Sequence, residues 1–182
     1  MKPITFITGN EKKAEYLSRY LRLPVKHLKI HLDEIQSLDL FEIVEHKVKQ
    51  AYKEVHGPVL VEDVSLKFSV LGKLPWPFIK FFESELGLEK LAKLASEENR
   101  NAVAICVFWY YDGEVLKFFE GSVPGRIAES PRWNWGFGWD KIFIPYFSSK
   151  TAAEMNEKEY ERFYTEEKPF EKIYAFLHAH EE

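Results

Sequence analysis

The feature that most constrains the fold is a junction between an apolar run and a helical pattern near the N-terminus. Residues 4–7 are apolar or β-branched, which predicts a buried strand. A Thr-Gly-Asn turn follows at residues 8–10, and the spacing of Ala14, Leu17 and Leu21 then predicts a helix. Such a junction directs backbone N–H groups and a helix N-terminus at one point, so it predicts an anion site, most naturally for phosphate. An ordinary strand–turn–helix explains the same residues, and a single glycine fits neither the dinucleotide fingerprint nor the P-loop.

Composition indicates a globular protein. The chain has 182 residues, of which 46% are hydrophobic, so it can bury a good core as a single domain, 1–182, folded as two lobes. Its net charge of -4 argues against a nucleic-acid partner. The single cysteine, Cys106, excludes a disulfide framework and a cysteine-built zinc site. Neither a signal peptide nor a membrane span is visible, which predicts a cytoplasmic protein without a membrane partner.

Beyond the first helix, apolar periodicity predicts a further succession of strands and helices. Strands are expected at residues 25–32, 59–61, 102–111, 115–122 and 142–144. Helices are expected at residues 40–55, 78–86, 89–95, 151–164 and 169–178. Asp112 and Gly113 are typical of a hairpin turn, and the prolines and glycine of residues 66–77 predict a loop.

Three acidic residues follow expected strands instead of lying on solvated helix faces: Glu34, Glu62 and Asp63. Ligands collect at strand ends in α/β proteins, and paired carboxylates there suit a hard divalent cation, Mg²⁺ above all. Taken singly, each residue is better explained as a turn former or a helix cap. Lys47 is expected on the side of the 40–55 helix opposite its apolar face. Together with the phosphate-type turn, these groups favour a site that neutralises a phosphoanhydride and orients a water.

A second unusual feature is an aromatic, glycine-bearing loop at residues 131–139, followed by Asp140. Its aromatic side chains alternate with asparagine and glycine: Trp133, Trp135, Phe137 and Trp139. Aromatic rings in such a loop can stack on a nucleobase, and the carboxylate can bond the base edge. A packed aromatic cluster beneath a loop explains this segment equally well.

Five motifs, in order along nearly the whole chain, resemble those of the inosine/xanthosine triphosphate pyrophosphatase family, the Ham1-type house-cleaning enzymes. The motifs are Thr-Gly-Asn-x-x-Lys at residues 8–13, Gly-Pro-Val-Leu-Val-Glu-Asp at 57–63, Leu-Gly-Lys-Leu-Pro-Trp-Pro at 71–77, Gly-Phe-Gly-Trp-Asp at 136–140 and Lys-Thr-Ala-Ala-Glu-Met at 150–155. The first motif is shifted at its final glutamate, near Glu15. In the third, Lys73 and Trp76 stand where the family usually has glycine.

The resemblance implies an elongated α/β fold, in which helices flank a twisted mixed sheet and two lobes enclose a nucleotide-binding cleft. It also implies a homodimer that hydrolyses (d)NTP substrates such as ITP, dITP or XTP to (d)NMP and pyrophosphate, with Mg²⁺ as cofactor and Mn²⁺ as its substitute. Glu34, Glu62 and Asp63 would hold the metal, and Asp63 and Lys13 would be catalytic. The substrate would be bound by the following residues: Thr8, Gly9, Asn10, Lys13, Lys47, Val64, Lys80, Phe137, Gly138, Trp139, Asp140, Tyr160, Thr165 and Glu166.

One departure from the family concerns base recognition. After the Glu-Met motif the family carries a lysine and then Ser-His-Arg, whose donors meet the oxygens of hypoxanthine or xanthine. This chain has Tyr160 and then Tyr-Thr-Glu at residues 164–166 in those places. Cationic and imidazole donors are thus replaced by hydroxyls and a carboxylate that only accepts.

We therefore expect an active pyrophosphatase whose base preference is changed or loosened. In one version Glu166 faces a base edge that offers N–H groups, and in the other it turns into solvent. Ordinary ITP/XTP activity, with Arg162 or Lys168 supplying the donors, is the enzymatic alternative. The non-enzymatic alternative is a relic that binds a nucleotide without turnover, against which the retained carboxylates argue.

Overall fold

The computed structural model describes residues 3–133 and 136–179 of the chain. The described residues group into two compact units. Unit 1 takes its residues from 1–63, 107–120 and 169–182, and unit 2 takes its residues from 64–106 and 121–168. Each unit is therefore built from segments that are far apart in the sequence.

The described residues form a mixed six-stranded sheet in the order β2-β1-β3-β4-β5-β6. Its strands are β1 (Ile4–Ile7), β2 (Val25–Leu28), β3 (Val59–Phe68), β4 (Asn101–Tyr111), β5 (Leu116–Ile127) and β6 (Phe143–Pro145). β1 pairs in parallel with both β2 and β3, whereas β5 and β6 are antiparallel. The chain passes between the two units within β3, β4 and β5. The predicted fold class, a mixed sheet flanked by helices, is confirmed.

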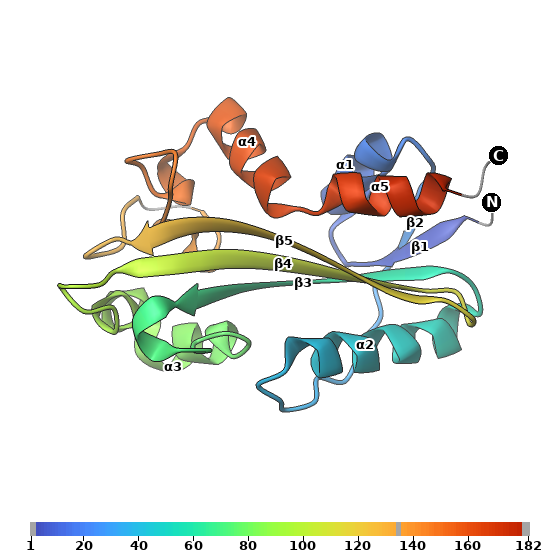
Figure 1. Cartoon of the computed structure of the whole chain (residues 1–182), viewed down its shortest axis with the longest axis horizontal. Coiled ribbons are helices and arrows are strands. Elements are labelled where there is room, and N and C mark those ends of the chain that lie inside the picture. Colours follow the sequence, from blue (N-terminus) through green and yellow to red (C-terminus); the bar gives the residue numbers. More distant parts are fainter. Residues whose placement is uncertain (1–2, 134–135, 180–182) are drawn as a thin grey trace. The chain divides into compact units, whose positions relative to one another are not determined.

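Three helices belong to unit 1: α1 (Glu11–Leu21), α2 (Leu40–Val55) and α5 (Phe170–His178). Figure 1 shows α1 and α5 on one face of the unit 1 strands and α2 on the other. α1 buries the predicted apolar face, and the ring of Tyr20 stacks on Phe170 of α5 at 4.7 Å. The side chain of Asp39 begins α2 by accepting a hydrogen bond from the N–H of Phe41. α1 therefore packs, and α2 begins, as the sequence pattern predicts.

Unit 2 contains α3 (Ile79–Lys93), α4 (Glu157–Glu167) and three 3₁₀ turns. The turns are η1 (Ser69–Leu71), η2 (Gly138–Lys141) and η3 (Ala152–Glu154). Gly87 interrupts α3 with φ 71° and ψ 161°, which agrees with the two helices expected there. A core that includes Phe68, Leu91 and Phe143 fills this unit. Across the described residues, no helix is both long and apolar enough to span a membrane.

Three expected strand lengths were wrong. β2 ends at Leu28 instead of residue 32, because its partner β1 ends at Ile7 and β2 is an edge strand of the sheet that the described residues form. β3 runs to Phe68 instead of residue 61, so the loop expected from residue 66 begins later. The charged residues Glu62 and Asp63 favoured an early end of this strand. They are nevertheless part of it, because each is paired with a lysine from a neighbouring helix. β5 likewise extends past the expected residue 122.

The helix expected at residues 151–164 was wrong, because two capping boxes divide the segment. Thr151 and Glu154 cap the short η3 turn. Asn156 then begins α4 by accepting a hydrogen bond from the N–H of Glu159, whose side chain accepts from Asn156 in return. The helix periodicity continues across this break, so it did not reveal two separate starts.

Candidate functional site

The predicted phosphate turn connects β1 to α1 in unit 1. The N–H of Asn10 donates to Thr8 Oγ1 at 3.1 Å, and Asn10 Oδ1 accepts from the N–H of Lys13 at 3.4 Å. A Cβ atom on Gly9 would lie 3.0 Å from Cδ of Lys29, a flexible side chain. These contacts form the N-terminus of an 11-residue helix, with an ammonium group in its first turn. The predicted turn is confirmed, and its chemistry suits an anion.

Lys13 links this turn to β3. Its Nζ donates to Glu62 Oε2 at 2.9 Å, and the Glu62 side chain is only 5% exposed. The Lys13 side chain keeps 37% of its surface exposed. A partly exposed ammonium held by a buried carboxylate is fixed in place while still open to an anion.

Lys47 binds two of the predicted metal-binding carboxylates. Its Nζ donates to Glu34 Oε1 at 2.7 Å and to Asp63 Oδ2 at 2.9 Å. The predicted position of Lys47 on the polar side of α2 was wrong, since the residue is only 6% exposed. Burial alone would lower the pKa of Lys47, but the charges and hydrogen bonds of Asp63 and Glu34 outweigh it and raise the pKa. Lys47 therefore remains an ammonium ion that draws the two carboxylates together.

The three predicted metal ligands do not meet at one point. Glu62 and Asp63 lie within β3 instead of at its end, and successive strand residues point to opposite faces. Accordingly, Glu62 pairs with Lys13 from α1 and Asp63 with Lys47 from α2, the two helices that Figure 1 shows on opposite faces of the strands. In the part of the chain that the structure describes, no three histidine, cysteine, aspartate or glutamate side chains are grouped to hold a metal.

The pair of Glu34 and Asp63 nevertheless fits a hard cation. Both carboxylates lie within 3 Å of the same ammonium nitrogen, so they already converge on one positive charge. Carboxylate oxygens are the protein ligands that Mg²⁺ and Mn²⁺ prefer. Glu34 lies in the segment between β2 and α2, not at a strand end, and its side chain is 51% exposed. Val64, the next residue of β3, is partly buried.

The aromatic loop lies in unit 2, and Asn134 and Trp135 within it fall outside the described residues. Phe137 is 87% exposed, while Trp139 packs edge-on against Phe143 at 5.7 Å. The loop thus combines both interpretations: Trp139 belongs to a packed aromatic cluster, and Phe137 offers a free ring face. Lys80, also in unit 2, is exposed in the first turn of α3.

Asp140 is buried at the end of this loop. Its Oδ2 accepts a hydrogen bond from the hydroxyl of Tyr160 at 3.2 Å, and the residue is 8% exposed. Burial, reinforced by the charge of Glu167, raises the pKa of Asp140 to about 7. Burial and the Asp140 charge likewise raise the pKa of Tyr160. The structure therefore brings together Asp140 and Tyr160, the residue in place of the family's lysine.

Thr165 and Glu166 are occupied by contacts within unit 2. The Thr165 hydroxyl lies within hydrogen-bonding distance of the carbonyl oxygens of Glu161 and Arg162. Glu166 Oε1 accepts from Arg162 Nε at 2.8 Å, and Glu166 Oε2 accepts from the Tyr146 hydroxyl at 3.1 Å. Both carboxylate oxygens of Glu166 are thus bound by neighbouring side chains.

The two candidate replacement donors are also engaged. Arg162 pairs with Glu166, and its guanidinium lies 4.0 Å from the ring centroid of Phe147. Lys168 is buried, where its Nζ lies 3.1 Å from Glu167 Oε2 and 3.4 Å from Cys106 Sγ. These contacts disfavour the interpretation in which Arg162 or Lys168 replaces the missing base donors.

The sequence as a whole matches a known family. The Ham1 family model aligns with residues 4–176. The chain belongs to the Ham1 family. Among curated relatives, inosine triphosphate pyrophosphatase 2 of Trypanosoma cruzi is 40% identical over 97% of this chain and 91% of its own length. The inosine triphosphate pyrophosphatase of Pyricularia oryzae is 37% identical over 97% of this chain and 94% of its own length.

Solved Ham1 structures share the fold. The Ham1 protein of Staphylococcus aureus superposes with a TM-score of 0.82 over 98% of this chain and 99% of its own, at 23% identity. The HAM1 protein of Coxiella burnetii gives a TM-score of 0.84 over 97% and 98% of the two chains, also at 23% identity. The arrangement of helices and strands is therefore that of the Ham1 family.

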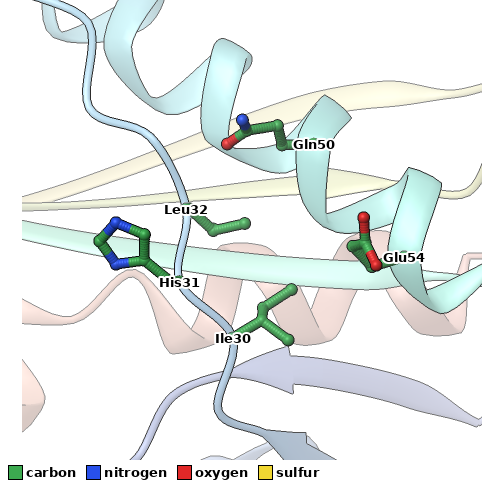
Figure 2. A pocket seen from close by; sticks show the side chains of 5 residues that line it. All are labelled: Ile30, His31, Leu32, Gln50 and Glu54. Carbon is green, nitrogen blue, oxygen red and sulfur yellow. The ribbon is translucent and has the colours of Figure 1, made fainter.

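Sequence reasoning missed Gln50, the residue that ties the segment before Glu34 to α2. Gln50 of α2 exchanges two hydrogen bonds with Asp33: the Asp33 N–H donates to Gln50 Oε1, and Gln50 Nε2 donates to Asp33 Oδ2, each at 2.8 Å. This tie holds the segment that carries Glu34 against α2, beside Lys47. Figure 2 shows the adjoining pocket of about 230 Å³, lined by Ile30, His31, Leu32, Gln50 and Glu54. No sequence pattern marks Gln50, because a polar residue on an exposed helix face is ordinary.

Proposed function

We propose that this chain is a nucleoside triphosphate pyrophosphatase that cleaves (d)NTP to (d)NMP and pyrophosphate, and so removes aberrant purine nucleotides such as ITP, dITP and XTP. One observation supports this function most: the convergence of Glu34 and Asp63 on the Lys47 ammonium in unit 1 of a Ham1 chain. A binding protein without turnover has no need for clustered carboxylates beside a phosphate-type turn, because they repel the anion unless a cation intervenes.

Unit 1 would hold the triphosphate. The turn of Thr8, Gly9 and Asn10 presents N–H groups at the positive end of α1, and Lys13 adds a charge-assisted donor. Lys47 adds a second ammonium, which both carboxylates keep protonated. These donors bind oxygens of the phosphate chain and offset the charge that develops on the leaving pyrophosphate.

Glu34 and Asp63 would hold Mg²⁺, for which Mn²⁺ can substitute, while Glu62, on the opposite face of β3, would hold Lys13 in place. When bound, the ion supplies charge neutralisation at the phosphate oxygens and polarisation of the attacking water. Asp63 accepts the proton that this water loses as its oxygen attacks the α-phosphorus. The bond between the α-phosphorus and the bridging oxygen breaks, and pyrophosphate leaves with the electron pair.

Unit 2 would hold the base. Phe137 offers an exposed ring for stacking, and Gly138, Trp139 and Asp140 form the adjoining turn. Lys80 adds a further donor for the substrate. The contacts of Thr165 and Glu166 with their own neighbours favour a loosened base preference over a carboxylate aimed at the base edge. We expect ITP and XTP to be accepted without strong exclusion of the ordinary triphosphates.

The assembly that we propose is a homodimer of a single-domain chain, 1–182, acting in the cytoplasm on a free nucleotide and not on nucleic acid. Neither the homodimer nor the location in the cytoplasm enters the chemistry above, which uses residues of one chain. Light scattering of the purified protein would measure the oligomeric state directly.

Product analysis tests the proposed function. The protein is incubated with ITP and Mg²⁺, and the products are separated by anion-exchange chromatography. We expect IMP and pyrophosphate in equal amounts, and no turnover after chelation of the divalent cation. Release of IDP and phosphate would contradict cleavage next to the α-phosphorus, and tight ITP binding without turnover would show that the chain is only a nucleotide-binding protein.

A further inference from the structure

The exposed ring of Phe137 lies between two glycines whose backbone is closely packed. Gly136 has φ +117°, and a Cβ added there would lie 2.7 Å from Cβ of Ala153 in η3. Gly138 has φ +41°, and a Cβ added there would lie 2.8 Å from Oε1 of Glu83 in α3. The turn is therefore pressed against η3 on one side of Phe137 and against the Glu83 carboxylate on the other. Both neighbours belong to unit 2.

Glu83 makes a specific contact with this turn. Its carboxylate packs against the backbone of Gly138, where an added Cβ atom would lie 2.8 Å from Oε1 and 3.1 Å from Oε2, beside the backbone N–H of Trp139, the second residue after Phe137. Its Oε1 atom is buried, and among the described residues it has no hydrogen-bond partner. Burial raises the pKa of Glu83, against the opposing effects of the Trp139 N–H and of the Lys80 charge. One oxygen of the Glu83 carboxyl group is therefore buried without the hydrogen bond that would offset its desolvation, which is unfavourable for stability.

The contact fixes more than one backbone atom. The Trp139 ring is packed into the unit 2 core against Phe143, so its backbone and its side chain are both held. The Trp139 carbonyl in turn accepts from the N–H of Ile142, which closes the η2 turn. Phe137 precedes this fixed point and Asp140 follows it. An anchored turn lowers the entropy that a stacking side chain loses when a ligand binds.

We propose that Glu83 is a positioning residue that holds the η2 turn so that the Phe137 ring is presented for stacking on the nucleobase. The inference rests on the proposed function, because it assigns the base to the Phe137 turn. It adds a residue on α3 that lies outside all five family motifs, and it distinguishes binding of the base from binding of the phosphates.

The test compares Glu83→Leu, which removes the acceptor, with Glu83→Gln, which retains an acceptor oxygen of similar shape. Glu85→Leu, on the exposed side of the same helix, is the matched control. Each variant is measured for kcat and KM with ITP, and for inhibition by inorganic tripolyphosphate, which has no base. Thermal unfolding verifies that each variant is folded, and Glu83→Ala replaces the leucine variant if that one does not fold.

We expect Glu83→Leu to raise the KM for ITP roughly tenfold, the size of a lost stacking contact, with kcat within about twofold of wild type. Tripolyphosphate inhibition should not change, Glu83→Gln should restore KM, and the control should match wild type. An unchanged KM in Glu83→Leu, an equal loss of tripolyphosphate affinity, or failure of Glu83→Gln to restore KM would each overturn the proposal. If wild type does not hydrolyse ITP, the proposed function fails, and calorimetric Kd values for ITP still test the positioning role.

Discussion

The carboxyl groups near the Thr8–Asn10 turn of unit 1 and those near the Phe137 turn of unit 2 have different environments. In unit 1, Glu62 is paired with Lys13, and Glu34 and Asp63 share Lys47. In unit 2, burial raises the pKa of Asp140, which accepts a hydrogen bond from the Tyr160 hydroxyl, and one buried oxygen of Glu83 has no hydrogen-bond partner among the described residues. These unit 1 carboxylates are thus paired with ammonium groups, whereas the carboxyl groups of Asp140 and Glu83 are removed from water without a cationic partner at hydrogen-bonding distance in the described part of the chain.

This difference indicates different ligands. Matched ammonium and carboxylate groups can exchange partners with phosphate oxygens and a divalent cation without leaving a buried charge unpaired. Desolvated carboxyl groups beside an exposed aromatic ring suit a neutral heterocycle, whose binding involves stacking and hydrogen bonds. Within a Ham1 chain, the phosphate chemistry is therefore expected from unit 1 and the base contacts from unit 2.

Removing one charge from unit 1 should have the largest effect on turnover. Asp63→Asn keeps the side-chain shape but can neither hold a cation as well nor take a proton from water. We expect kcat to fall about a hundredfold or more, the usual cost of removing a general base. Glu114→Gln, which changes an exposed carboxylate elsewhere in unit 1, is the matched control and should retain turnover. Near-normal kcat in folded Asp63→Asn would place the reacting groups elsewhere.

A smaller and uniform loss is expected at Lys13. Lys13→Ala removes a charge-assisted contact to phosphate, so kcat/KM should fall roughly tenfold to a hundredfold. The factor should be the same for ITP, GTP and ATP, because every triphosphate loses the same contact. Lys12→Ala provides the neighbouring control. A loss that depends strongly on the base would show that Lys13 is not confined to the phosphates.

The pH dependence of stability should differ in sign between the units. The raised pKa of Asp140 means that folding favours its protonated form, so its contribution is complete below about pH 4 and is lost as pH rises to about 7. Asp140→Asn should therefore increase the free energy of unfolding at pH 8 by about 1–4 kcal/mol, and much less at pH 4. Denaturant titrations at the two pH values measure the change. Equal effects at both would contradict a buried, neutral Asp140.

Asp112 in unit 1 provides the comparison of opposite sign. Burial would raise its pKa, but hydrogen bonds from the backbone of Val115 and Glu114 prevail and lower it. Its contribution is therefore present above the ordinary pKa and lost as pH falls through the lowered value. Asp112→Asn should destabilise the protein at pH 8, where Asp140→Asn stabilises it.

The smallest expected effect is a partial restoration of base discrimination. The double variant Thr165→His with Glu166→Arg replaces two base-end residues by those of the family. We expect the ratio of kcat/KM for ITP to that for GTP to rise about threefold to tenfold, less than a fully formed site provides. An unchanged ratio would show that these two positions do not determine selectivity in this chain.

Local patterns predicted the elements whose ends depend on neighbouring residues. The Thr8–Asn10 turn, α2 with its Asp39 cap and the Asp112 hairpin follow from caps, turns and periodicity that act over a few residues. The family resemblance added the order of motifs, which the alignment of residues 4–176 with the Ham1 family confirms.

Long-range pairing was not visible in the sequence. Lys47 and Asp63 are 16 residues apart in the sequence, and Lys13 and Glu62 are 49 residues apart. Without knowledge of these pairs, the charge of Lys47 predicted an exposed side chain, and the charges of Glu62 and Asp63 predicted an early end of β3. The contacts of Glu83 with Gly138 and Trp139 join α3 to a loop far along the chain, so no local signal identified them.

Relative kcat/KM values for ITP, XTP, GTP, ATP and CTP, measured by pyrophosphate release from the wild-type protein, test the central claim most directly. The claim is that this Ham1 chain keeps the phosphate chemistry of unit 1 while its base end no longer carries the Ser-His-Arg donors. It predicts pyrophosphate release from every triphosphate, with ITP and XTP preferred by no more than about tenfold. A preference for ITP and XTP of about a hundredfold or more would contradict it.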